Sequence, residues 1–430
     1  MVSAIGEGIK DRLATLWDTT PLGTLVGYLA VALALVVAAF LYLTRDPGSQ
    51  GPDTAVLSSI ETSTDEAISG PAAEVPDPAI EQPGSFFVVG ADIIDPEGNV
   101  FVPVGTNAAI RVTEYPYVFD GGNGGVNGRV DSIKTWGWNT IRASLQCYNE
   151  TGVPSQQEVI DGIDATVNEL TEARIVVVLA CHDGTGADVE VNDEIEVQVR
   201  AFWDQVVNRY RDNPYVWFNF FNEPFKTHEP EQWLELHRYY YDRYRNDGVD
   251  NVMILDLPIF GQGIDVLAED PFADELGTSC NTVLGWHAWG AVSGAQATVD
   301  DYLEFSRAAT GRGLAVVISE AGVPDPLDAG TAGNPEWNKS GYYAALEVAL
   351  NSNIGLLWWH GTGDTDSDLY YPLKLDKSGF WSANNSGSLT AAGATFWEYS
   401  HRERRDIPFE GDVRDSGCRS AADLGPNATG

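Results

Sequence analysis

The chain has 430 residues and 43 % of them are hydrophobic, enough for one large domain of about 250 to 350 residues with extensions. Acidic residues number 63 against 25 basic ones, which gives a formal net charge of −38. This charge argues against nucleic acid as a partner, because binding phosphates requires a basic face.

The acidity also predicts adaptation to concentrated salt. Self-repulsion destabilises a compact chain in dilute buffer, whereas 1 M salt shortens the electrostatic screening length to roughly 3 Å. In this respect the composition resembles that of proteins from salt-loving archaea. An acidic protein from ordinary surroundings is the alternative.

The first distinctive segment is LGTLVGYLAVALALVVAAFLYL, residues 22–43, which follows a short N-terminal segment, residues 1–21. These 22 residues are almost wholly apolar, and a helix of that length spans a bilayer core of about 30 Å. A cleaved signal peptide is the alternative, but its apolar region is usually only about 7 to 15 residues long. We therefore expect a single-pass transmembrane helix in the cell membrane. Lys10 and Arg12 before it favour an extracellular location for the remainder of the chain.

Residues 44–84 form the next segment, rich in Ser, Thr, Pro, Asp and Glu. It has too little apolar surface to offset the entropy lost on ordering, so we expect a disordered linker. The main domain is expected over residues 85–405 and a C-terminal tail over 406–430. At the start of the domain, two short apolar runs surround the turn signal Asp95-Pro96-Glu97-Gly98-Asn99, which predicts a β-hairpin.

Eight short apolar runs then recur along the chain, separated by longer amphipathic stretches with helical spacing such as residues 155–173 and 230–248. The eight runs are FVPVGTN (101–107), NTIRAS (139–144), IVVVLACH (175–182), VWFNFFNE (216–223), NVMILDLP (251–258), TVLGWHAW (282–289), LAVVISEA (314–321) and IGLLWWHG (354–361). Runs that are apolar throughout are typical of parallel strands buried on both faces. Eight strand-helix units predict an α/β fold, a (β/α)8 TIM barrel. A doubly wound sheet is the alternative, but it usually carries a glycine-rich phosphate turn after its first strand.

In such a barrel the functional residues lie at the carboxyl ends of the strands. The polar or aromatic residues that close the runs are Asn107, Arg142, His182, Asn222, Glu223, His287, Glu320 and Trp359. Glu223 and Glu320 are 97 residues apart, which corresponds to three units of about 32 residues. We therefore expect their carboxylates to face each other at one mouth of the barrel.

A pair of facing carboxylates suits cleavage of a glycosidic bond, in which one protonates the leaving oxygen and the other attacks the anomeric carbon. The two roles require unequal pKa values, set by apolar neighbours for one group and by an arginine for the other. A salt-bridged or solvated glutamate is the alternative for either residue alone. Two glutamates at equivalent strand ends favour the catalytic interpretation.

The segments VFVPVGTN, NTIRAS, VVLACHD, FFNEP, GWHAW, VVISEAG and GLLWWH, in this order, resemble the retaining (β/α)8 glycoside hydrolases of clan A, in particular glycoside hydrolase family five. The resemblance covers roughly residues 86–399. It implies that Glu223 is the general acid/base and Glu320 the nucleophile. No cofactor and no metal are implied.

The resemblance also assigns roles to the other strand-end residues. Arg142 would hold the nucleophile ionised, and Asn222 would bind the sugar 2-hydroxyl. His182 would contact the same sugar, His287 would hydrogen-bond near the acid/base, and Trp359 would form the floor under the sugar. One position departs from the family, because His287-Ala288-Trp289 stands where His-x-Tyr is common. Trp289 puts the usual tyrosine contact to the nucleophile in question.

The expected substrate is β-1,4-glucan, hydrolysed internally, with β-mannan as the alternative. A barrel that binds polysaccharide without cleaving it is a second alternative. Other aromatic residues are candidates for sugar stacking, although core packing is the commoner role of such rings. They are Tyr115, Tyr117, Trp233 and Trp337. The segment GDTDSD, residues 363–368, begins like a calcium loop but lacks the following glycine and the distal glutamate.

The four cysteines, Cys147, Cys181, Cys280 and Cys418, show neither CxxC spacing nor the density of a disulfide framework. Cys147 and Cys181 each follow an apolar run and so could be neighbours in space. Buried free thiols are nevertheless the expectation.

Overall fold

The structure is a computed structural model that describes residues 84–109, 126–148, 155–292, 295–322, 335–359, 391–402 and 407–422. All of them lie in one compact unit, Pro76–Gly430. The predicted membrane segment 22–43, and the predicted linker 44–84 apart from Gly84, fall outside these residues. Within the described ranges, no helix is both long and apolar enough to cross a bilayer.

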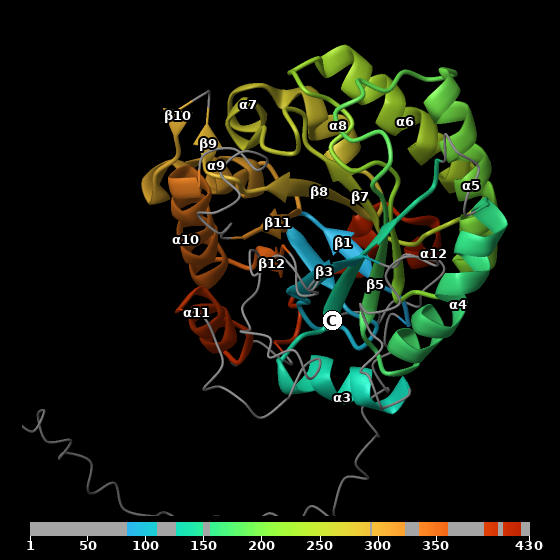
Figure 1. Cartoon of the computed structure of the whole chain (residues 1–430), viewed down its shortest axis with the longest axis horizontal. Coiled ribbons are helices and arrows are strands. Elements are labelled where there is room, and N and C mark those ends of the chain that lie inside the picture. The colour runs from blue at the N-terminus through green and yellow to red at the C-terminus, as the bar shows by residue number, and fades with distance from the viewer. Residues whose placement is uncertain are drawn as a thin grey trace, which may run out of the picture. The chain divides into compact units, whose positions relative to one another are not determined.

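Eight parallel strands close into a barrel (Figure 1). The strands are β3 (Val104–Ala109), β4 (Thr140–Leu145), β5 (Val176–Cys181), β6 (Val216–Asn219), β7 (Met253–Asp256), β8 (Thr282–His287), β11 (Val316–Ala321) and β12 (Gly355–Trp358). They pair in chain order, and β12 returns to pair with β3. This closure confirms the predicted (β/α)8 barrel and excludes the doubly wound sheet.

Helices surround the strands, as Figure 1 shows. They are α3 (Val126–Thr135), α4 (Gln156–Glu172), α5 (Glu194–Tyr210), α6 (Pro230–Asn246), α7 (Ile264–Glu269), α8 (Asp274–Gly277), α9 (Val299–Gly311), α10 (Pro335–Asn351), α11 (Ala391–Ser400) and α12 (Arg419–Ala422). Short 3₁₀ helices lie at η1 (Pro271–Ala273) and η4 (Val413–Ser416), and β9 (Ala291–Val292) pairs with β10 (Ala295–Gln296).

Helix α4 shows why the amphipathic stretches fold as they do. Ser155 and Glu158 form a capping box at its start, each side chain accepting a hydrogen bond from the other residue's backbone N–H. Val159, Ile163 and Val167 recur at helical spacing and are buried. The helix therefore buries one apolar stripe against the barrel.

The strands are apolar throughout because both of their faces are covered. In β5, Val177 and Leu179 belong to the large core between the barrel and the helices. Val176 and Val178 belong to a second cluster, inside the barrel, that also contains Trp217. Alternate side chains of one strand therefore fill two different cores, which removes the polar alternation of a half-exposed strand.

The predicted N-terminal hairpin is present as β1 (Phe87–Val89) and β2 (Asp92–Ile94), which pair antiparallel. Its turn is at Gly90 and Ala91, which the sequence did not single out. Gly90 has φ +58°, a left-handed conformation that favours glycine. The Asp95–Asn99 segment forms the predicted turn, because Ile94 and Val100 bridge antiparallel across it and the Phe101 N–H donates to Ile93 O.

All four cysteines form disulfides, so the expectation of free thiols was wrong. Cys181 ends β5 and Leu145 pairs with it on β4, which leaves Cys147 only two residues further along. The Cα atoms of Cys147 and Cys181 are 5.7 Å apart. Neighbouring parallel strands bring together cysteines that are 34 residues apart in the chain, as their places after two apolar runs suggested.

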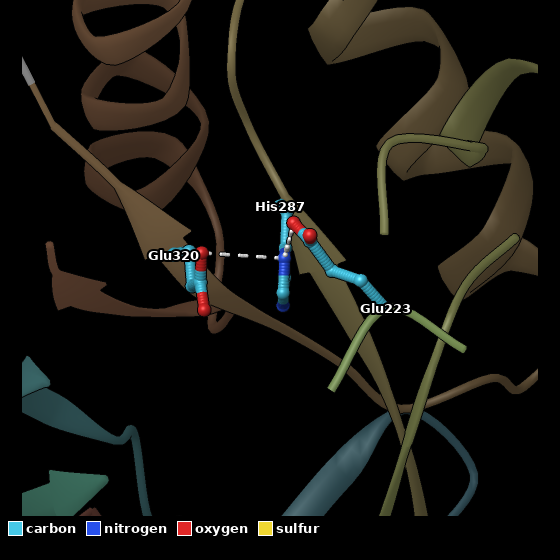
Figure 2. Close-up of side chains that lie close together, drawn as sticks. All are labelled: Glu223, His287 and Glu320. Atoms are coloured by element: carbon cyan, nitrogen blue, oxygen red, sulfur yellow. Dashed lines mark hydrogen bonds and ion pairs between the residues drawn. The ribbon is translucent and has the colours of Figure 1, made fainter. Parts of the chain in front are cut away.

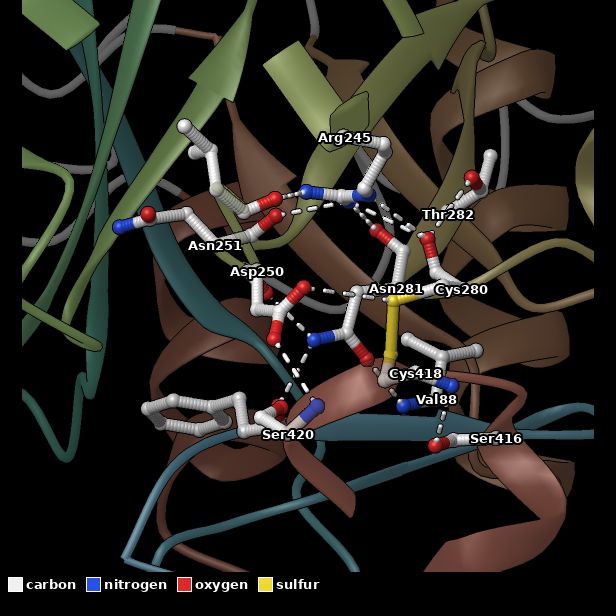
Figure 3. The surroundings of a disulfide bond; sticks show 12 residues. Val88, Arg245, Asp250, Asn251, Cys280, Asn281, Thr282, Ser416, Cys418 and Ser420 are labelled. Atoms are coloured by element: carbon white, nitrogen blue, oxygen red, sulfur yellow. Dashed lines mark hydrogen bonds between the residues drawn. A yellow bond between two sulfur atoms is a disulfide. The ribbon is translucent and has the colours of Figure 1, made fainter. Parts of the chain in front are cut away.

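The second disulfide, Cys280–Cys418, links the segment before β8 to the described part of the predicted C-terminal tail (Figure 3). Beside it, the Asn281 side chain donates to Phe86 O and accepts from the Val88 N–H. The hairpin and the tail are thus attached at the amino-terminal end of the barrel, opposite to the strand ends considered next.

Candidate active site

The predicted site residues come together at the carboxyl ends of the strands. Arg142 lies in β4, His182 follows β5, Asn222 and Glu223 follow β6, His287 ends β8, Glu320 lies in β11, and Trp359 follows β12. Most of these side chains are buried or half-buried. The barrel therefore brings together residues from six strands.

Glu223, His287 and Glu320 form the centre of the site (Figure 2). His287 Nδ1 lies 2.7 Å from Glu223 Oε1 and 3.4 Å from Glu320 Oε2. One oxygen of each carboxylate and one nitrogen of the histidine all lie within 4.8 Å of one another. This spacing is typical of retaining glycosidases, whose two carboxyl groups are about 5 to 5.5 Å apart, and not of inverting ones, at about 6.5 to 9.5 Å.

Glu223 has a backbone conformation that glutamate seldom adopts. Its φ is +47°, in the left-handed region, where a residue other than glycine costs on the order of 1–3 kcal/mol. Two hydrogen bonds hold it there: its N–H donates to Asp256 Oδ2 at 3.2 Å, and its carbonyl accepts from the Gly186 N–H at 2.7 Å. The buried Phe220 and Phe221 precede it, so an apolar segment turns sharply and presents a carboxylate.

The Arg142 guanidinium is fully buried and contacts six neighbouring side chains, among them Glu320 and three asparagines. Nη1 donates to Glu320 Oε1 at 2.7 Å and to Asn107 Oδ1 at 2.9 Å. Nη2 donates to Asn222 Oδ1 and to Asn219 Oδ1, both at 2.7 Å. Charge-assisted bonds of this kind fix orientation as well as charge, so Arg142 holds Glu320 and Asn222 in a defined relation.

Asp256, the last residue of β7, is a member of the site that the sequence reasoning missed. It is fully buried, and its Oδ2 lies 3.2 Å from both Arg142 Nη2 and His287 Nε2. Asn219, in β6, was missed as well and donates from Nδ2 to Asp256 Oδ1 at 3.2 Å. The available signal was an aspartate closing the apolar run NVMILDLP, the same pattern that identified Glu320.

The charges of the site are strongly coupled. Burial alone would lower the pKa of His287, but Glu320, Asp256 and Glu223 outweigh it and raise that pKa to about 10. Burial opposes ionisation of Asp256, yet His287 and Arg142 keep its pKa below the ordinary value. Burial raises the pKa of Glu320 to about 7, even though His287 and Arg142 act to lower it. The carboxylates of Glu223 and Asp256 act in the same direction as burial on Glu320, because a neighbouring negative charge disfavours its ionised form.

Glu223, His287 and Glu320 lie close enough to one another to be considered as metal ligands. A metal ligand must offer a lone pair. His287 has a carboxylate at each ring nitrogen, so its imidazole carries both protons and offers none. The chemistry of this donor set therefore favours an ion-pair network over a metal centre.

His182, Trp359 and Trp289 form an aromatic group beside the carboxylates. The rings of His182 and Trp359 are stacked with centroids 5.4 Å apart, and Trp289 meets Trp359 edge-on at 6.5 Å. Ser144 Oγ lies 2.9 Å from His182 Nε2. Among the described hydrogen bonds, none joins the Trp289 indole to Glu320, and His287 Nδ1 is the group beside Glu320 Oε2.

The remaining sequence candidates separate into two groups. Trp233 is fully buried in α6, where its indole donates to Asp256 O at 2.9 Å, so it takes the commoner role of core packing and not that of sugar stacking. The side chain packs where it does because its helical position faces the barrel. Tyr115, Tyr117 and the segment 363–368 lie outside the described residues. Trp337 lies in α10, but its side chain is not among those described.

The amino-acid sequence matches a known protein family over the part of the chain that carries this site. The model of the family described as Cellulase (glycosyl hydrolase family 5) matches residues 108–364, more than half of the chain. The chain belongs to glycosyl hydrolase family 5. The matched range contains every residue placed in the site above except Asn107.

Two curated relatives have similar sequences. Endoglucanase A of Butyrivibrio fibrisolvens is 23 % identical over 304 residues, which cover 68 % of this chain and 64 % of that protein. Mannan endo-1,4-beta-mannosidase of Cellvibrio japonicus is 25 % identical over 189 residues, which cover 43 % of this chain and 40 % of that protein. The chain thus aligns with less than two thirds of the length of either relative.

Solved structures share the fold. The β-mannanase of Streptomyces thermolilacinus has a TM-score of 0.54 at 23 % identity, covering 74 % of this chain and 98 % of that chain. A thermostable and highly halotolerant GH5 cellulase from an Icelandic hot spring isolate has a TM-score of 0.53 at 16 % identity, covering 75 % and 97 %. At these identities the likeness is one of fold.

Proposed function

We propose that the protein is a retaining endo-β-1,4-glycanase that hydrolyses β-1,4-glucan, with Glu223 as general acid/base and Glu320 as nucleophile. The observation that carries the proposal is the carboxylate pair, whose oxygens approach within 4.8 Å at the carboxyl ends of the strands. Membership of glycosyl hydrolase family 5 and the similarity to an endoglucanase support the same reaction class.

The unequal surroundings of the two glutamates support the assignment of roles. Arg142 donates directly to Glu320 at 2.7 Å, which favours the ionised form that a nucleophile needs, although burial outweighs this effect and raises the pKa of Glu320 to about 7. Glu223 is the more exposed carboxylate, with 13 % of its side chain accessible against 4 % for Glu320, so it is the one that a leaving oxygen reaches.

The reaction follows in two steps. In the first, Glu223 gives its proton to the glycosidic oxygen while a Glu320 oxygen bonds to the anomeric carbon, and the carbon to leaving-oxygen bond breaks. In the second, Glu223 takes a proton from water, the water oxygen bonds to the anomeric carbon, and Glu320 leaves as a carboxylate. Two inversions retain the anomeric configuration.

The neighbouring residues would bind the sugar. Asn222 is held by Arg142 beside Glu223, in a position to contact the 2-hydroxyl, and His182 would contact the same ring. The stacked pair of His182 and Trp359 forms the aromatic floor, which Trp289 extends. The polysaccharide is the only partner this arrangement requires.

β-1,4-Mannan is the second candidate substrate. The mannan endo-1,4-beta-mannosidase relative and the fold shared with a β-mannanase favour it, and the catalytic core serves both sugars equally. A site that binds polysaccharide without cleavage is a third possibility, against which the retention of both glutamates argues.

Release of reducing sugar from carboxymethylcellulose and from mannan, measured in multimolar salt, separates these candidates. We expect release from carboxymethylcellulose that is lost in Glu320→Gln and falls about 10²- to 10⁴-fold in Glu223→Gln. Faster release from mannan would select the second substrate. Full activity in either variant would refute the roles, and no release from any β-glycan would favour binding alone.

We further propose that residues 22–43 anchor the protein in the cell membrane with the catalytic domain outside, and that the domain works in concentrated salt. The apolar run and the net charge of −38 support these two points. The two disulfides support an extracellular location, because such bonds persist mainly in oxidising compartments. Protease digestion of intact cells tests the location: an external domain is degraded, and a protected one contradicts the proposal.

A further inference from the structure

Asp256 receives no role in the two-step reaction, although it lies beneath the site. Its carboxylate is fully buried, and a buried charge persists only when it is paired and hydrogen-bonded. Oδ2 lies 3.2 Å from each of three groups: Arg142 Nη2 and the Glu223 N–H donate hydrogen bonds to it, and His287 Nε2 is at ion-pair distance. Asp256 therefore contacts the side chains of Arg142 and His287 and the backbone of Glu223, the proposed acid/base.

The fold leaves dedicated space for this carboxylate. Gly285 lies opposite in β8, where a Cβ atom would be 2.3 Å from Asp256 Oδ1. Behind it, the Trp233 indole donates to the Asp256 carbonyl at 2.9 Å. Contacts from β8 and α6 thus fix both the side chain and the main chain of Asp256.

The consequence for His287 follows from its proton count. Nδ1 faces Glu223 at 2.7 Å and Nε2 faces Asp256 at 3.2 Å. A neutral imidazole would present a lone pair to one of these carboxylates, whereas the doubly protonated ring donates to both. The titratable and charged groups facing His287 and Asp256 are Glu223, Glu320 and Arg142, with the buried neutral His237 behind Asp256.

The consequence for Glu223 concerns both geometry and charge. Its left-handed backbone is held in part by the hydrogen bond from its N–H to Asp256. Its Oε1 faces a cation only as long as His287 keeps the second proton. The backbone conformation of Glu223 and the second proton of His287 therefore both depend on the Asp256 carboxylate.

We propose that Asp256 is a positioning residue for the acid/base: it keeps His287 doubly protonated and anchors the Glu223 backbone, so that Glu223 is held as an effective proton donor. This inference rests on the proposed function. A merely structural role of Asp256 would affect cleavage of every substrate to the same extent. The proposed role predicts a loss only on substrates whose cleavage needs the proton of Glu223.

Asp256→Asn in the full-length protein tests the proposal, since asparagine keeps the shape but loses the charge. With dinitrophenyl β-cellobioside, whose leaving group needs no proton, we expect kcat/KM to stay within about threefold of the natural protein. With cellotetraose, which needs the proton, we expect kcat/KM to fall about 10- to 100-fold, less than on removing the acid itself.

Glu196→Gln is the matched control. Glu196 is also a fully buried carboxylate, in the first turn of α5, where it accepts from Tyr240 Oη and the Asn192 N–H. None of its described hydrogen bonds or ion pairs involves a residue of the site. Its substitution should lower both kcat/KM values by the same factor or neither. An equal loss on both substrates in Asp256→Asn, or no loss on cellotetraose, would overturn the proposal.

A nitrogen-15 NMR spectrum of the histidine rings tests the same point without activity. The chain has only six histidines, and His287→Gln identifies the signal. At pH 8 the natural protein should show two ring N–H groups for His287, and Asp256→Asn should show one. A single N–H in the natural protein refutes the inference even if the variant does not fold. Inactivity of the natural protein on both substrates would instead refute the proposed function.

Discussion

At the scale of single residues, Glu320 gives a prediction for the pH dependence. The first step of the proposed reaction needs Glu320 as a carboxylate, so that its oxygen can bond to the anomeric carbon. Burial raises the pKa of Glu320 to about 7, although His287 and Arg142 act to lower it. Because protonated Glu320 cannot attack, we expect kcat/KM on cello-oligosaccharides to fall as the pH decreases from 7 to 5. A rate that stays level or rises between pH 7 and pH 5 would contradict this account of the nucleophile.

The protonated His287 gives a second prediction, for stability. Its pKa is raised from 6.5 to about 10, so its contribution is fully present below about pH 6.5 and is lost as the pH rises through 10. The free energy of unfolding should decrease between pH 7 and pH 9 by up to about 1.4 kcal/mol per pH unit for this proton. Urea unfolding at constant salt measures the slope, which Asp256→Asn should flatten. A flat slope in the natural protein would contradict the double protonation of His287.

Strand-end position was enough to predict Arg142, His287 and Glu320 as neighbours, because parallel strands of one barrel share a mouth. Asp256 closes the run NVMILDLP as Glu320 closes its own run, so the same rule could have predicted it. Asn219 lies within a buried run, and only the closed barrel reveals that its side chain points toward Arg142.

At the scale of elements, periodicity predicted the strands and helices well, since strands covered on both faces are apolar throughout. It also predicted the turn at Asp95–Asn99 and the proximity of Cys147 and Cys181, each of which follows an apolar run. The turn at Gly90 and the bonding of all four cysteines were not predicted. Sequence spacing gives no distance between sulfur atoms, so it could not distinguish a disulfide from two free thiols.

The disulfide Cys280–Cys418 gives a prediction at this scale. It closes a loop of 138 residues, and removal of such a bond typically costs about 2–5 kcal/mol. In a Cys280→Ser, Cys418→Ser double variant we expect a lower thermal midpoint but unchanged kcat at low temperature, because the bond lies at the end of the barrel opposite to Glu223 and Glu320. Thermal unfolding and assays at matched salt check both. A loss of kcat while the protein remains folded would contradict the separation of the two ends.

At the scale of the whole molecule, the net charge of −38 dominates. Repulsion within one compact chain is screened as the Debye length falls from about 8 Å at 0.15 M to about 3 Å at 1 M salt. We expect the thermal midpoint to rise steadily from 0.15 M to 2 M KCl. A midpoint that does not change, or that falls, would show that the acidic surface is not adapted to salt.

The central claim, a two-step reaction through Glu320, is tested most directly by mass spectrometry of a trapped intermediate. A 2-deoxy-2-fluoro-β-cellobioside with a dinitrophenyl leaving group slows the second step and leaves the sugar on the nucleophile. The account predicts one added sugar, located by peptide mapping on Glu320. A sugar attached to Glu223, or rapid hydrolysis with inversion and no attached sugar, would contradict it.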